Sequence, residues 1–90
     1  MLKVNEHYVL KEVAGEFMLV YQDASNVDFS KVITLNELGV LIFKAVSEGK
    51  NEEDIVAAIL KEYDIDEETV RKDVTEFIKK LKELEIIINA

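Results

Sequence analysis

The chain has 90 residues, 49% of them hydrophobic and 33% charged, which fits one small globular domain and excludes an intrinsically disordered chain. It has no cysteine, so disulfides, thiolate metal sites and cysteine nucleophiles are excluded. Its net charge of −8 opposes binding to phosphate backbones, which depends on Lys and Arg. Without a membrane-length apolar run or a signal-peptide pattern, we expect one cytoplasmic domain over residues 1–90, with no nucleic-acid or membrane partner.

The first third of the chain is rich in β-branched and aromatic residues, which favour strands. Two such runs, Tyr8–Val13 and Phe17–Tyr21, lie on either side of a glycine, and we predict a hairpin over residues 8–22. We place its two-residue turn at Gly15 and Glu16, because the first turn position needs a positive φ that glycine adopts at low cost.

Two further extended segments are expected. The polar stretch 23–30 is expected to be a turn-like connection, and Lys31–Thr34 then forms a short third strand. At the other end of the chain, Glu85–Ile88 leaves the helical period. Its Ile86–Ile88 run is too apolar for a free tail, so it either docks on the sheet as a further strand or contacts a partner.

Three helices are predicted from capping residues that precede apolar residues at helical spacing. The first begins after Asn36 and ends at Gly49, and the second begins after Asn51. The third is the longest, at about residues 67–84, and Asp66 caps it. A tight connection joins the second and third helices, as in a helix-turn-helix.

This order predicts an α+β, winged helix-turn-helix-like fold, in which a three-stranded antiparallel sheet precedes a three-helix bundle. In a DNA-binding version the third helix would enter the major groove with its N-terminal turn against the bases. That turn carries Asp66, Glu67 and Glu68, which would repel DNA. This charge counts against a winged-helix transcriptional regulator, which we keep as the alternative to a peptide-binding or protein-binding domain. A plain interaction domain with another protein partner is a third possibility.

The sequence contains no catalytic constellation. Asp64, Asp66, Glu67 and Glu68 fit a helix cap and first turn, where acids are favoured, and they lack the ligand order of a calcium loop. His7 is the only histidine and is expected at the surface. With no nucleophile–base pair and no phosphate-binding glycine loop, we expect no catalytic residue, no metal site, no cofactor and no enzymatic activity of the chain alone.

The order and spacing of the helical part resemble the pyrroloquinoline quinone synthesis protein D (PqqD) family, the prototype of peptide-recognition elements for ribosomally made, modified peptides. The resemblance covers residues 31–84 well and the hairpin in kind. It is carried by Leu35–Phe43, Gly49, Glu53–Val56, Ile59, Tyr63–Val70, Asp73-Val74 and Phe77-Ile78.

The resemblance implies a non-catalytic peptide chaperone. Such a protein binds the leader segment of a precursor peptide and presents it to a modifying enzyme, often a radical SAM maturase. It does not fix whether the product is the quinone cofactor or another modified peptide. The leader is expected to add as a strand beside the third strand and to rest against the third helix, a mode that also suits an unpaired sheet edge.

The predicted peptide-binding residues come from that strand and helix. Phe77 and Ile78 are adjacent in a wide apolar stripe, so either both belong to the core or Ile78 lines an apolar groove. In the second case basic residues would lie near its rim and suit an acidic leader. The predicted set is Lys31, Val32, Ile33, Thr34, Arg71, Thr75, Ile78, Lys79 and Lys82.

Overall fold

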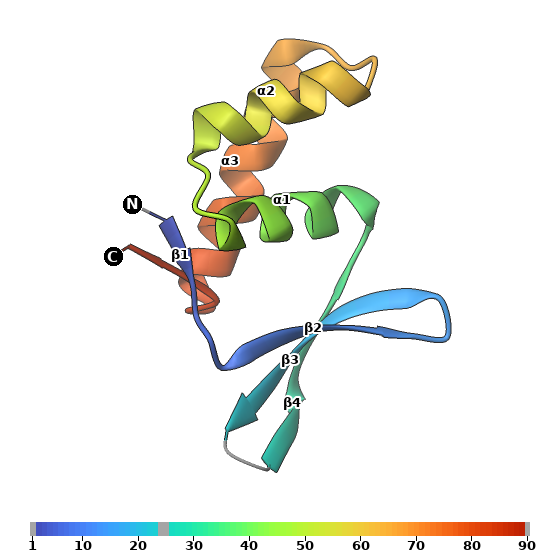
Figure 1. Ribbon diagram of the computed structural model, residues 1–90, viewed down its shortest axis with the longest axis vertical. Helices are drawn as coiled ribbons and strands as arrows, with labels where there is room; N and C mark the ends of the chain where they lie inside the picture. Colours follow the sequence, from blue (N-terminus) through green and yellow to red (C-terminus); the bar gives the residue numbers. More distant parts are fainter. Residues whose placement is uncertain (1, 24–25, 90) are drawn as a thin grey trace.

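The computed structural model describes residues 2–23 and 26–89, including all of their side chains except those of residues 26–31. The first half of the chain forms strands and the second half forms helices (Figure 1). In chain order the elements are β1 (Leu2–Val4), β2 (Tyr8–Val13), β3 (Glu16–Asp23), β4 (Asn26–Leu35), α1 (Glu37–Ser47), α2 (Glu52–Glu62), α3 (Glu67–Glu83) and β5 (Ile87–Asn89).

The fold confirms the predicted α+β class, with an antiparallel sheet in the order β2-β3-β4 followed by three helices. In Figure 1, α1 lies between this sheet and α2, α3 passes behind α1, and the two ends of the described chain lie close together. A second, two-stranded sheet pairs β1 with β5. Among the described residues, no helix is long and apolar enough to span a membrane.

The predicted hairpin is confirmed, but its turn lies one residue earlier than expected. Val13 pairs with Glu16, so Ala14 and Gly15 are the two turn residues. Their φ angles are +53° and +83°. Positive φ at both central positions is typical of a type I′ turn, whose twist matches that of the flanking strands. The assignment of Gly15 and Glu16 was wrong because the cross-strand register, and not the glycine, fixes the turn.

The third strand is much longer than the four residues predicted. β3 and β4 pair as far as Asp23 and Asn26, so the expected turn-like stretch is largely strand, and residues 24 and 25 lie outside the described part. The register is irregular, because Leu19 pairs with Ile33 while Tyr21 pairs with Asp28. Extra residues on β4 therefore oppose Val20, and such bulges bend the strand that carries them.

All three predicted helix starts are confirmed by their caps. The side-chain oxygen of Asn36 accepts the N–H of Gly39 at 2.8 Å, and that of Asn51 accepts the N–H of Asp54 at 2.9 Å. Asp66 accepts the N–H of Thr69 at 3.0 Å. Each cap satisfies an N–H that has no partner within its helix, which stabilises the helix by about 1 kcal/mol.

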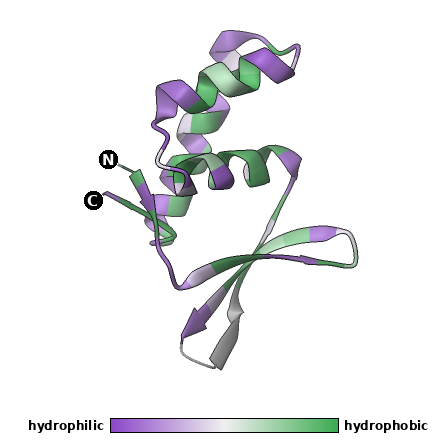
Figure 2. Ribbon diagram, viewed as in Figure 1, coloured by the Kyte–Doolittle hydropathy of each residue, from purple (hydrophilic) through white to green (hydrophobic). Residues whose placement is uncertain are grey.

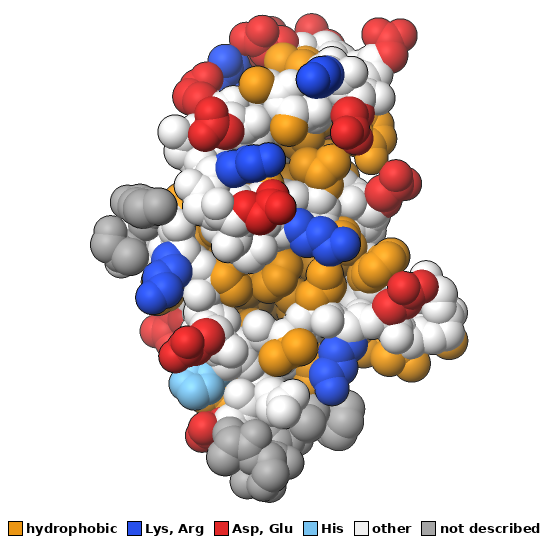
Figure 3. All heavy atoms as spheres, in the orientation of Figure 1, with side chains coloured by type: hydrophobic (Ala, Val, Ile, Leu, Met, Phe, Trp, Pro, Cys, Tyr) orange, Lys and Arg blue, Asp and Glu red, His pale blue; other side chains and the backbone are white. Residues whose placement is uncertain are grey.

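One hydrophobic core joins the helices to the sheets. Its fully buried members include Leu19 of β3, Ile42 of α1, Ile55 of α2 and Leu81 of α3. Figure 2 shows the alternation between hydrophobic and hydrophilic residues along the helices that produces this burial. Burying each such side chain contributes about 1.5–3 kcal/mol. On the face in Figure 3, hydrophobic side chains also gather at the surface between α1 and the β2–β3 hairpin.

The two ends of the chain are held together by a strand that the sequence analysis did not predict. Leu2–Val4 forms β1 and pairs with β5, so the apolar C-terminal run does form a strand, but outside the main sheet. The backbone N–H of Asn5 donates to the carbonyl of Ile86 at 2.7 Å, and its side-chain amide donates to the carbonyl of Glu85 at 2.9 Å. These contacts fix the segment that follows α3.

Candidate peptide-binding site

β4 is an edge strand of the main sheet. The strand order β2-β3-β4 gives it a partner on one side only within the described residues. Its other edge therefore carries backbone N–H and C=O groups without a partner strand. Such an edge is a template for pairing with another extended chain. Leu35, the last residue of β4, is buried, so the strand is anchored in the core next to its open edge.

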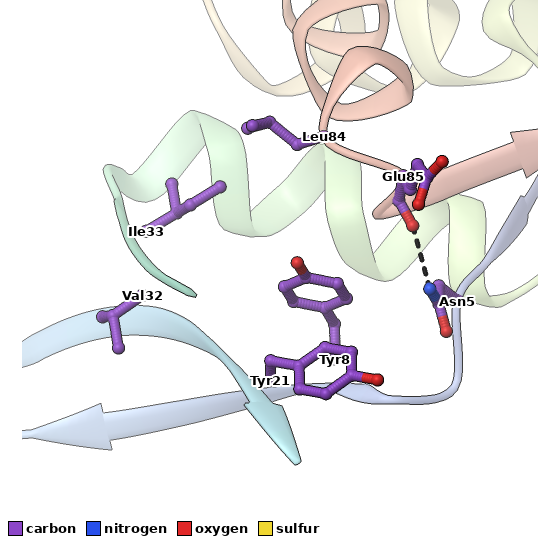
Figure 4. Close-up of a pocket in the computed structure, with 7 residues that line it drawn as sticks. All are labelled: Asn5, Tyr8, Tyr21, Val32, Ile33, Leu84 and Glu85. Atoms are coloured by element: carbon purple, nitrogen blue, oxygen red, sulfur yellow. Dashed lines mark hydrogen bonds between the residues drawn. The ribbon is translucent and has the colours of Figure 1, made fainter. Parts of the chain in front are cut away.

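A hollow of about 430 Å³ lies between this part of β4 and the C-terminal end of α3 (Figure 4). The side chains of Ile33 and Leu84 lie on one side of it, and the two tyrosine rings lie below. The rings of Tyr8 and Tyr21 meet edge to face, with centroids 5.3 Å apart. α1 passes behind the hollow. The lining residues are Asn5, Tyr8, Tyr21, Val32, Ile33, Leu84 and Glu85.

A second hollow of about 300 Å³ lies where the N-terminal end of α1 approaches the middle of α3. Gly39 favours this close approach, because a Cβ atom there would lie 3.1 Å from the ring of Phe77 and the ring would have to shift slightly. Phe77 is half-buried and forms an apolar wall. The lining residues are Asn36, Leu38, Gly39, Ile42, Asp73, Glu76, Phe77 and Lys80.

The two hollows share no lining residue, but both lie against one side of α3 and its C-terminal end, and we call them together the β4–α3 groove. On one side, Val32 and Ile33 of β4 line the first hollow, and Asn36, the N-cap of α1, lines the second. The other side is a stripe on one face of α3 and its C-cap, lined by Asp73, the adjacent Glu76 and Phe77, Lys80 and Leu84. At 1.5 Å per residue this stripe is about 16 Å long. An extended peptide of about five residues spans that length.

The strand residues of the predicted site lie at this groove. Val32 and Ile33 line the first hollow, and Thr34 is exposed on the same strand. The backbone of Lys31 belongs to β4, but its side chain lies outside the described part. The strand half of the predicted site is thus brought to the open edge.

The helix half of the predicted site is on other faces of α3. Ile78 is 1% exposed and packs in the core, so the expectation that it lines the groove was wrong. The other four predicted residues are exposed but are not among the lining residues of either hollow: Arg71, Thr75, Lys79 and Lys82. At about 100° per residue, these four lie on the side of the helix opposite the Phe77 stripe.

The residues that the sequence analysis missed share a signal that was present in the sequence. Phe77 is an aromatic residue with Asp73 and Leu84 at helical spacing on the same stripe. Which of two adjacent apolar residues faces the core depends on the rotation of α3 about its axis. The packing of α3 sets that rotation, and it buries Ile78 and leaves Phe77 half-exposed.

Arg71 pairs with carboxylates of α2 and α3 away from the groove. Its Nη1 lies 2.7 Å from Oε1 of Glu53 on α2, and its Nε lies 3.0 Å from Oε2 of Glu67 on its own helix. The hydrogen bond and positive charge of Arg71 lower the pKa of Glu53, and the two carboxylates raise the pKa of Arg71. Arg71 therefore ties α3 to α2, on the exposed side of the helix pair.

Tyr63, at the end of α2, makes a similar surface contact with α1. Its hydroxyl donates to Oε1 of Glu37 at 3.1 Å, and this bond raises the pKa of Tyr63.

Within residues 2–23 and 26–89, no cluster of His, Asp and Glu is placed to hold a metal ion. The site therefore offers backbone hydrogen bonds, apolar walls and surface charges, which together suit an extended peptide.

A family match agrees with this geometry. The family described as coenzyme PQQ synthesis protein D (PqqD) matches residues 4–87. The chain belongs to the PqqD family. No curated protein sequence matches it significantly. The family match includes the helical part that carried the resemblance, and it extends through the hairpin to β5.

Two solved structures resemble the chain over nearly its whole length. One is described as TbiB1 in complex with the TbiA(beta) leader peptide, with 27% identity and a TM-score of 0.78, covering 98% of this chain and 96% of that one. The other is described as lasso peptide synthetase B1 complexed with the leader peptide, with 15% identity and a TM-score of 0.78, covering 98% of each chain. The second likeness concerns the fold alone.

Proposed function

We propose that this PqqD-family chain is a non-catalytic chaperone that binds the leader segment of a ribosomally made precursor peptide. The leader adds as a strand to the open edge of β4 and rests its side chains in the β4–α3 groove. One observation carries the proposal: the unpaired edge strand β4 lines a hollow with the end of α3, in a fold whose solved relative at 27% identity is described in complex with a leader peptide.

The geometry of a strand explains how the groove would bind a peptide and distinguish one peptide sequence from another. Main-chain hydrogen bonds to β4 supply affinity that does not depend on the peptide sequence. Alternate side chains of the added strand point the same way and recur about every 6.6 Å. A peptide of about five residues therefore directs two or three side chains at the groove. Those side chains supply the specificity.

The chain then acts by bringing the precursor to a modifying enzyme. Holding the leader raises the local concentration of the attached core peptide at the enzyme, without chemistry by the chaperone itself. We propose a radical SAM maturase as this enzyme, the class that the family resemblance implies. The assay compares modification of the full-length precursor with and without this chain, and then of a leaderless core. Equal rates with and without the chain would contradict the proposed role.

The binding test uses short peptides encoded close to the gene of this chain, each labelled and titrated with the intact protein. Mixed-sequence duplex DNA serves as the competing ligand, at about 0.1 M salt, where the Debye length is roughly 10 Å. We expect one peptide to bind and the duplex not to bind. Tight, strongly salt-dependent DNA binding without peptide binding would support the winged-helix regulator instead.

Backbone N-methylation of the bound peptide tests strand addition directly. Each N-methyl group removes one N–H donor, and in a strand only alternate donors face a given neighbour. We expect affinity to fall at every second position of a run of about five residues, a length given by the groove. Loss at every position, or at none, would show that the peptide binds in another conformation.

A further inference from the structure

The charged side chains of α3 are divided between its two sides. The side away from the groove carries Arg71, Lys79 and Lys82 together with the acidic Glu67 and Glu68. The stripe that lines the groove carries Asp73, Glu76 and Lys80, and Glu85 follows at the rim of the first hollow. The groove is therefore lined by three carboxylates and one ammonium group among the described side chains. This is the reverse of the basic rim expected from the sequence.

The two carboxylates of the second hollow are available to a ligand. In the part of the chain that the structure describes, ion pairs join Lys50 to Glu48 and Arg71 to Glu53 and Glu67, and none involves Asp73 or Glu76. Both residues are exposed, one turn apart, and they lie beside the apolar ring of Phe77. A peptide lying on that ring would exclude water next to the carboxylates and strengthen their attraction for a cation.

The N-terminus of α1 lies at the same end of the groove and would by itself favour an anion. Its positive end is already partly compensated. Asn36 accepts the N–H of Gly39, and Glu37 lies in the first turn. Lys80 can balance at most one of the two carboxylates on the opposite wall. An uncompensated negative charge remains at this end of the groove.

We propose that the Asp73–Glu76 end of the groove selects peptides that place a lysine or arginine side chain there. This inference rests on the proposed peptide binding and adds the charge of the ligand. The aliphatic stem of the basic side chain lies along Phe77, and its charged end reaches the carboxylates, which suits the amphipathic shape of Lys and Arg. The Leu84 end of the groove, with its tyrosines, takes a less polar side chain of the same peptide.

The test starts from a display library of random 12-residue peptides selected on the intact wild-type chain. The tightest binder is synthesised with each Lys or Arg replaced in turn by Gln. One such replacement is expected to weaken binding to the wild type about tenfold, the effect of one or two moderately exposed ion pairs. Asp73→Asn/Glu76→Gln should bind the original and the replaced peptide equally. Glu62→Gln/Glu68→Gln, with the same change in charge on surfaces away from the groove, should keep the discrimination.

Charge reversal completes the test. Asp73→Lys/Glu76→Lys should prefer the same peptide with Glu at the sensitive position. Because these side chains are exposed, circular dichroism should show all variants folded. Binders without a preferred basic position, or equal discrimination by both double variants, would overturn this inference while leaving peptide binding in place. A library that yields no binder at all would overturn the proposed function as well.

Discussion

The helical core and the β4 edge satisfy their backbone and apolar groups in different ways. In the helices, each start is capped by a side chain, and the inner residues of α3 are almost completely buried. At β4, one edge has no partner strand among the described residues, and Val32 and Ile33 are only half-buried. We call the helical core the closed region and the β4 edge the open region. The contrast teaches that the closed region supplies stability and holds the open region in the shape that the proposed peptide binding needs.

The largest expected effect tests the closed region. Ile78→Ala removes a side chain that is 1% exposed, and its cavity should lower the free energy of unfolding by about 3 kcal/mol. Urea unfolding measures this. Thr75→Ala, one turn away on the exposed side of α3, should change stability by less than about 0.5 kcal/mol. A small effect at Ile78 would mean that α3 is rotated from the orientation described above.

The next effect tests the open region with a matched pair of exposed apolar residues. Leu84 is 44% exposed at the groove, and Ile65 is 39% exposed at the far end of α3. Leu84→Ser should weaken binding of a selected peptide about tenfold, as a side chain at the centre of an interface does. Ile65→Ser should leave binding unchanged. Fluorescence anisotropy with the labelled peptide measures both, and equal losses would place the peptide elsewhere.

A third prediction separates the two regions at equivalent caps. Asn36 and Asn51 make the same cap at similar distances, but only Asn36 lines the groove. Asn36→Ala and Asn51→Ala should each lower stability by about 1 kcal/mol. Only Asn36→Ala should also weaken peptide binding, compared at a temperature where both variants are folded. If both or neither altered binding, the second hollow would not belong to the peptide site.

The smallest effect concerns the exposed contact of Arg71. Arg71 lowers the pKa of Glu53, so the stability from this pair is present above the pKa of Glu53 in the unfolded chain and is lost as pH falls through its lower folded value. Arg71→Gln should remove that part of the acid dependence. It should leave peptide binding unchanged, because Arg71 lies away from the groove. Urea titrations at several acidic pH values check the first point, and a peptide titration checks the second.

The family, the α+β class and the helix starts could be predicted from the sequence because they depend on local signals. Asn36, Asn51 and Asp66 cap the N–H groups of their own helices, and the apolar spacing that follows each is independent of the rest of the chain. The position of the strand segment Val32–Thr34 next to the helical part was also predictable, whereas its role in peptide binding stays a prediction. An apolar strand at the border of the helical part is visible without coordinates.

Only the tertiary structure decided which stripe of α3 faces the groove and what pairs with the C-terminal strand. Phe77 and Ile78 have similar hydrophobicity, and their roles differ because α1 and the sheet approach α3 from particular sides. Leu2–Val4 is too short to form a strand by itself and does so because β5 lies beside it. Local sequence sets which segments become helices and strands, whereas packing between distant segments sets the rotation, register and partners on which the site depends.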